Sequence, residues 1–189
     1  MLPNILFTDK QGIHSSDLYS LMFRDKRVIW LNTEINADTA ASVCLQLEYL
    51  DSLAEEDITI YINSPGGSVS AGLAIVDCME RCKSDIVTIC TGCAASMASV
   101  ISAYGTKGKR YVTPHAEIMI HQPLGGISGQ ASDIERAANH ITKTKELLMK
   151  MLSERTGQTV KQVTLDCDRD SYMSAETAIE YGIADKIYE

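Results

Sequence analysis

The chain has 189 residues, 45% of them hydrophobic, and a formal net charge of −8 at pH 7. This length predicts one domain with a substantial core, and the negative charge argues against nucleic acid or an anionic membrane as partner. Residues 1–10 lack a signal-peptide pattern, and no apolar run reaches the ~18 residues that a membrane span requires. We therefore expect a cytoplasmic protein.

Apolar, β-branched runs alternate with helical patterns along most of the chain. We expect strands at 28–31, 58–62, 86–90, 110–112 and 117–120. We expect helices at 37–50, 69–81, 96–104, 133–155, a short stretch from Thr159, and 175–181. The first 25 or so residues read as irregular apart from a short helix at 16–23. This alternation predicts an α/β fold with a mainly parallel sheet, in which sites form at the carboxyl ends of strands.

Ser96 lies where a predicted buried strand turns into a predicted helix, with small residues on both sides. A helix N-terminus there would supply free backbone N–H groups and a partial positive charge. These are the surroundings that a nucleophilic serine and its oxyanion hole require. Serine is also a common N-cap, and this run alone favours the capping role.

Three further features lie near other predicted strand ends. Gly66 and Gly67 allow a close backbone approach and do not continue into a phosphate-binding or dinucleotide-binding motif. His121 follows an apolar strand and precedes a Pro/Gly loop, which makes it the best-placed general base. The other histidines lie in an irregular segment, a turn and a polar helix: His14, His115 and His140. The carboxylate that would orient the imidazole is left open among Asp166, Asp168 and Asp170.

The cysteines include two closely spaced pairs, Cys78 with Cys82 and Cys90 with Cys93. Such spacing can indicate a zinc site. The first pair lies on an apolar helix face and the second runs into the Ser96 turn. We therefore expect small buried thiols in a reducing compartment and no metal.

Four segments carry a resemblance to a known family. They are Tyr61–Val69 (YINSPGGSV), Ala94–Met97 (AASM), Met119–Gly126 (MIHQPLGG) and Asp168–Asp170 (DRD). In this order and spacing they resemble the Clp protease proteolytic subunit, the ClpP family of peptidases (S14), from about Tyr19 to Ile187. The resemblance implies a ClpP/crotonase-like fold with a protruding handle helix.

The resemblance also implies roles for individual residues. Ser96 is expected to be the nucleophile, His121 the general base and Asp170 the orienting carboxylate, which resolves the choice among the aspartates. The oxyanion hole would use the N–H groups of Gly67 and Met97. Substrate contacts are expected at Val69, Leu124 and Gly126. The implied activity is that of an ATP-dependent Clp endopeptidase that hydrolyses unfolded proteins to small peptides.

An assembly follows from the same resemblance. Residues 1–26 would form an axial segment, and residues 27–189 one domain with a handle at about 122–155. Seven-membered rings would stack into a tetradecamer, with Asp168 and Arg169 coupling ring contacts to the catalytic aspartate. The subunit would need no cofactor, because ATP is used by a partner AAA+ unfoldase such as ClpX, ClpA or ClpC. That ATPase is expected to dock at Tyr61, Ile89 and Tyr111.

Two departures from the family pattern suggest a divergent paralogue. The residues after Gly12 differ from the usual charged pattern, and threonines replace larger apolar residues around the docking site, at Thr59, Thr91 and Thr113. We interpret the chain as one that docks an ATPase weakly or acts beside a second subunit type in a mixed barrel. The alternatives are a weakly active or structural subunit of a mixed barrel and, in a different class, a crotonase-type acyl-CoA enzyme.

Overall fold

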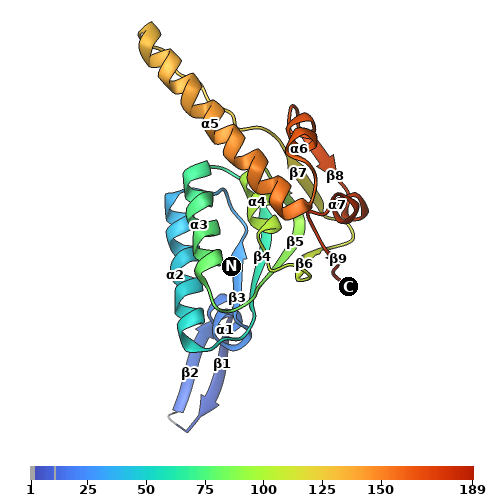
Figure 1. The fold of residues 1–189 in the computed structure, drawn as a ribbon. Helices are drawn as coiled ribbons and strands as arrows, with labels where there is room; N and C mark the ends of the chain where they lie inside the picture. The colour runs from blue at the N-terminus through green and yellow to red at the C-terminus, as the bar shows by residue number, and fades with distance from the viewer. Residues whose placement is uncertain (1–2, 11) are drawn as a thin grey trace.

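The computed structural model describes residues 3–10 and 12–189 of the protein, and a branched sheet lies at its centre (Figure 1). Five parallel strands pair in the order β3 (Val28–Leu31), β4 (Ile58–Ser64), β5 (Ile86–Ala95), β6 (Arg110–Val112) and β9 (Lys186–Ile187). The second half of β5 pairs instead with β7 (Glu117–Ile120), also in parallel. β8 (Ser171–Met173) is antiparallel to β7. The expected α/β fold with a mainly parallel sheet is therefore confirmed.

Helices α2 (Ala37–Leu53) and α3 (Val69–Arg81) lie side by side against the sheet (Figure 1). Each begins where the sequence places a cap: the Asn36 side chain accepts from the Thr39 N–H at 2.9 Å, and Ser68 caps α3. Along β4, buried residues alternate with residues that are not fully buried. One face of the sheet is thus covered and the other stays partly open.

Three further helices lie near the branched end of the sheet. The short helix α4 (Met97–Ala103) is wholly buried, while α6 (Val160–Asp166) and α7 (Ala175–Tyr181) lie near β7 and β8. Gly182 ends α7 in the left-handed conformation, as its sequence predicts. Among the described residues, no helix has the length and apolar character needed to cross a membrane.

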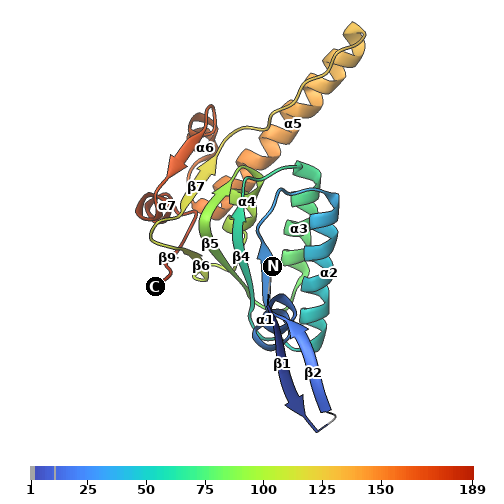
Figure 2. The same cartoon turned by 180° about the vertical axis from the view of Figure 1, so that it is seen from behind.

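Two projections extend from opposite ends of the domain (Figures 1 and 2). One is the N-terminal half of α5 (Ala131–Thr156), whose buried residues all lie in its C-terminal half: Leu148, Met149, Met151 and Leu152. The other is a hairpin of β1 (Asn4–Asp9) and β2 (Gly12–Asp17). At about 1.5 Å per residue, α5 is roughly 39 Å long, so much of it stands clear of the domain.

The N-terminal segment differs from the sequence-based expectation. In place of an irregular stretch with a helix at 16–23, the hairpin is followed by α1 (Leu18–Lys26), which Asp17 caps. The serines of β2 give this segment no apolar strand pattern. The strand instead forms through cross-strand pairs such as Phe7 against His14. Residues 1, 2 and 11 of the predicted axial segment lie outside the described residues.

The sheet also extends further than predicted. β5 continues five residues beyond Cys90, through Gly92 at a φ of 74°. An added Cβ on Gly92 would lie 2.8 Å from the Asn63 side chain. Glycine at this position therefore lets β4 and β5 remain paired beyond the shift in their register at residues 62–64. β8 and β9 were not predicted, because their two or three residues contain no run of apolar, β-branched side chains.

Candidate active site

The branch of β5, β7 and β8 brings three distant parts of the chain to one edge of the sheet. Ala95, the last residue of β5, pairs with Met119, and Ile120, the last residue of β7, pairs with Ser171. Ser96, His121 and Asp170 are the residues next to these pairs. Because β8 runs antiparallel to β7, its start lies at the same edge as the ends of β5 and β7.

Ser96 occupies a strained turn between β5 and α4. Its φ is 55° and its ψ is −124°, a combination that non-glycine residues rarely adopt. The backbone is held from both sides: its N–H donates to the Met119 carbonyl at 2.9 Å, and its carbonyl accepts from the Ser99 hydroxyl at 2.6 Å. The Ser96 side chain makes no capping hydrogen bond, so the capping role that the local sequence favoured is wrong.

The Ser96 hydroxyl instead begins a chain of three side chains. Ser96 Oγ lies 2.8 Å from His121 Nε2, and His121 Nδ1 lies 3.0 Å from Asp170 Oδ1. An ionised carboxylate only accepts, so Nδ1 carries the ring proton and Nε2 is left to accept from the serine. The His121 side chain is 15% exposed and that of Asp170 is 58% exposed.

The loop after β4 packs directly against the Ser96 turn. A Cβ added to Gly66 would lie 2.5 Å from the Ala95 carbonyl oxygen, 2.7 Å from Ser96 Cβ and 3.0 Å from Met97 N. Ser64 holds this loop by accepting from the Gly66 N–H. The N–H groups of Gly67 and Met97 donate to no other described residue, which leaves both available to a ligand.

Two apolar hollows lie beside these groups. The smaller contains Ser96 and His121 and is otherwise lined mainly by apolar side chains, among them Val69, Val100 and Leu152. The larger, of about 450 Å³, runs between the start of α3 and the middle of α5 and contains Val69 and Leu124. Leu124 is 84% exposed. Gly126 lies further along the same segment with open space around it.

The loop that carries Asp170 is tied to β7 by the residue after His121. The Gln122 N–H donates to the Cys167 carbonyl at 2.7 Å, and its side-chain Nε2 donates to the Asp168 carbonyl at 2.9 Å. Asp168 and Arg169 form a neighbouring ion pair, 3.7 Å apart with side chains 60% and 86% exposed. Such a pair contributes little to the stability of the single chain.

The three residues predicted to dock an ATPase fall in one row across the open face of the sheet. The register pairs Tyr61 with Ile89 and Ile89 with Tyr111, and it adds Trp30 opposite Tyr61. The Trp30 and Tyr61 rings stack 4.6 Å apart. Ile89 is only 2% exposed, so it is covered by its aromatic neighbours, and these neighbours form the surface to which a partner could bind.

The cysteines near Ser96 do not offer an alternative nucleophile. Burial raises the pKa of the Cys90 and Cys167 thiols to about 12, and it also raises that of Cys93. The thiolate is the reactive form, so these groups are inert at neutral pH. None of the six cysteines is in a disulfide.

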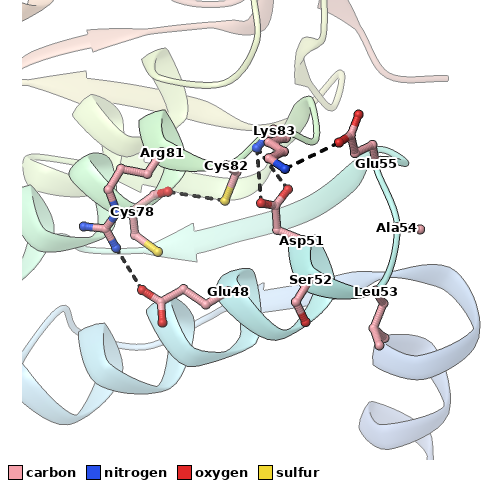
Figure 3. Close-up of a pocket in the computed structure, with 10 residues that line it drawn as sticks. All are labelled: Glu48, Asp51, Ser52, Leu53, Ala54, Glu55, Cys78, Arg81, Cys82 and Lys83. Carbon is pink, nitrogen blue, oxygen red and sulfur yellow. Dashed lines mark hydrogen bonds and ion pairs between the residues drawn. The ribbon is translucent and has the colours of Figure 1, made fainter.

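The other cysteine pair lines a separate cavity of about 440 Å³ between α2 and α3 (Figure 3). The acids beside it are already engaged: Glu48 pairs with Arg81 at 2.8 Å, and Asp51 accepts from the Lys83 and Ser84 backbone. Within residues 3–10 and 12–189, no group of three or more His, Cys, Asp or Glu side chains could hold a metal ion.

Sequence reasoning singled out Gly66 and Gly67 for a close backbone approach, but it missed Gln122 as the tie between two loops and Trp30 in the aromatic row. Gln122 had a weak signal, because it is a polar residue next to the candidate base. Trp30 had none, since its importance depends on which strands become neighbours.

The chain matches a known protein family over most of its length. A family model described as Clp protease matches residues 10–189, which is all of the chain except its first nine residues. The match includes every strand of the central sheet and all the residues that form the edge described above.

Proposed function

Because this chain belongs to the Clp protease family, as a ClpP-type protease subunit, we propose that it is a serine endopeptidase whose nucleophile is Ser96. The observation that carries the proposal is the unbroken chain from Ser96 Oγ through His121 to Asp170, with separations of 2.8 and 3.0 Å. The strained backbone at Ser96 supports the proposal, since residues with rare backbone angles are concentrated at active sites.

The proposed reaction is acyl transfer to water. His121 Nε2 takes the hydroxyl proton as Ser96 Oγ attacks a peptide carbonyl, and Asp170 keeps the imidazole in the required tautomer. The oxyanion of the tetrahedral intermediate accepts from the Gly67 and Met97 N–H groups, each donor being worth about 3–4 kcal/mol. His121 then protonates the leaving amine, and water hydrolyses the acyl-enzyme by the same route in reverse.

The proposed substrates are unfolded chains bound in extended form. The apolar hollows beside Ser96 favour uncharged side chains, with Val69 and Leu124 at their borders. The exposed segment around Gly126 has unpaired backbone that could hydrogen-bond an extended peptide. Neither contact would require a defined fold in the substrate.

We also propose that the subunit works inside a stacked double ring of fourteen copies, fed by an AAA+ unfoldase that uses ATP, in the cytoplasm. The exposed half of α5 supports an assembly, because Ile134 is 43% exposed in the N-terminal half of the helix, where no described residue is buried. Six unpaired cysteines fit a reducing compartment.

Weak docking of the ATPase, or a mixed barrel with a second paralogue, is the finer form of this proposal. The aromatic row offers a docking surface, but the threonines next to it remove apolar area that would otherwise stabilise the contact. Binding of the purified assembly to its unfoldase tests this form. Nanomolar docking to the homomeric protein would contradict it.

The central test is labelling by a fluorophosphonate together with hydrolysis of a short fluorogenic peptide. We expect labelling and hydrolysis in the parent protein and the loss of both in Ser96→Ala and His121→Ala. Ser52→Ala, on α2, and His115→Ala, in the turn between β6 and β7, are matched controls at exposed positions and should behave like the parent. An assembled protein that neither labels nor hydrolyses peptide would contradict the proposal and favour a structural subunit.

A further inference from the structure

The loop that carries Asp170 is held by a pair of side chains that the proposed reaction does not use. Gln122 donates through Nε2 to the Asp168 carbonyl at 2.9 Å, two residues before Asp170. Its other amide atom, Oε1, accepts from Lys145 Nζ at 2.8 Å. Lys145 lies on α5, just before the part of that helix that is buried in the domain.

The lysine determines which way the amide of Gln122 points. An ammonium group has donors only, so the amide oxygen must face Lys145 and the NH₂ group must face the Asp168 carbonyl. Without Lys145, the amide can rotate and present its oxygen to that carbonyl, which would break the tie. The Lys145 contact therefore selects the one orientation in which Gln122 holds the loop.

The position of the Asp170 carboxylate depends on the hydrogen bonds that hold its loop. Asp170 is 58% exposed, so packing does not fix its carboxylate, which nevertheless has to lie 3.0 Å from His121 Nδ1. Gln122 is the residue after His121, and it grips the loop twice, through its N–H to Cys167 and through its side chain to Asp168. A shift of the loop would move Asp170 relative to the ring.

We propose that Lys145 and Gln122 are a positioning pair that holds Asp170 in line with His121. This inference rests on the proposed serine-protease function, and it concerns turnover rather than substrate binding. Neither side chain lines the two hollows beside Ser96. Displacement of a catalytic group by about 1 Å can lower a rate by 10²-fold, so loosening the pair should lower kcat and leave KM nearly unchanged.

The test compares substitutions at Lys145 in the full-length assembled protein. Lys145→Met keeps the length of the side chain and removes the donor, and we expect kcat for a short peptide to fall about ten- to a hundredfold with KM within about twofold. Lys145→Arg retains donors and should recover most of the rate. Lys143→Met, on the exposed side of the same helix, removes the same charge and should match the parent.

A substitution at Gln122 tests the direction of the amide. Gln122→Glu retains an acceptor for Lys145 but has no donor, so two acceptors would face each other at Asp168. We expect a fall in kcat at least as large as that of Lys145→Met. Gln122→Glu with the parent's kcat would overturn the proposal.

Hydrogen exchange of residues 166–172, followed by mass spectrometry, supplies a readout independent of activity. We expect faster exchange in this segment for Lys145→Met and for Gln122→Glu, with the parent's pattern elsewhere and an unchanged assembly size. Parent-like exchange and kcat in Lys145→Met would overturn the inference while leaving the protease function intact. Faster exchange with unchanged kcat, or lower kcat with unchanged exchange, would also overturn it. If the parent protein has no peptidase activity but the two variants still exchange faster than the parent, the positioning contact is supported and the protease function is refuted.

Discussion

Ser96 and Asp170 lie at the two ends of one hydrogen-bonded chain, but the molecule holds them in different ways. Ser96 belongs to a strained turn between a central strand and the wholly buried helix α4, with Gly66 packed against its backbone. Asp170 belongs to an exposed loop that depends on a few hydrogen bonds, mainly those of Gln122. We therefore expect changes at Ser96 and its supports to affect folding and activity together, and changes at Asp170 to affect activity alone.

The largest effect is expected at the exposed end. Asp170→Asn keeps the shape of the side chain but removes the charge that sets the His121 tautomer, so kcat should fall about 10³–10⁴-fold, or roughly 4–5 kcal/mol in activation free energy. The free energy of unfolding in urea should change by less than about 0.5 kcal/mol, because the group is exposed. A fall in kcat smaller than tenfold would mean that Asp170 is not the orienting carboxylate.

Gly66→Ala tests the buried end. Its new Cβ would collide with the Ala95 carbonyl and with Ser96, at a φ of 88° that alanine tolerates poorly, so the protein should lose about 2–4 kcal/mol of unfolding free energy. Fluorophosphonate labelling of Ser96 should slow in parallel. Gly126→Ala, placed in open space, is the matched control for stability. Parent-like stability and labelling in Gly66→Ala would show that packing of Gly66 does not hold the Ser96 turn.

Ser99→Ala should give a smaller effect of the same kind. Its buried hydroxyl donates to the Ser96 carbonyl at 2.6 Å, and removal of that bond should lower the unfolding free energy by about 1 kcal/mol. A several-fold slower labelling of Ser96 should accompany it. Thermal unfolding and labelling rates, with Ser52→Ala as reference, measure both. Full labelling speed would show that the turn needs no help from Ser99.

The smallest effect on the single chain is expected at Arg169. Its ion pair with Asp168 is exposed, so Arg169→Ala should change the unfolding free energy by less than about 0.5 kcal/mol. If the loop couples to ring contacts, sedimentation should nevertheless show smaller assemblies. An unchanged assembly with unchanged kcat would remove Arg169 from the coupling role.

Much of the fold could be predicted because its signals are local. The caps Asn36 and Ser68 and the stop at Gly182 depend on neighbours within four residues, and the corresponding helix ends were predicted to within a residue. The hairpin of β1 and β2 could not, because its serine-rich second strand gains stability only from pairing across the turn. β8 could not be predicted for the same reason, since its three residues form a strand only by pairing with β7.

The candidate site divides in the same way. The residue types at Ser96 and His121 and their places at strand ends were visible in the sequence, but the choice of Asp170 over Asp166 and Asp168 came from family resemblance. In the structure, Asp170 reaches His121, Asp166 contacts Tyr181 and Gln162, and Asp168 pairs with Arg169. The difference comes from the turn that leads into β8, which no local pattern encodes.

By itself the sequence determined the alternation of the longer strands and helices, the chemistry of the residues at their ends and the family to which they point. Only the tertiary structure decided that the Ser96 side chain faces His121 instead of capping α4, that Gly66 contacts the Ser96 turn, and that Gln122 joins Lys145 to the Asp170 loop. Capping and periodicity act within a few residues, whereas these contacts join residues 23 to 46 positions apart, through the pairing of β4, β5, β7 and β8 and the packing of α5.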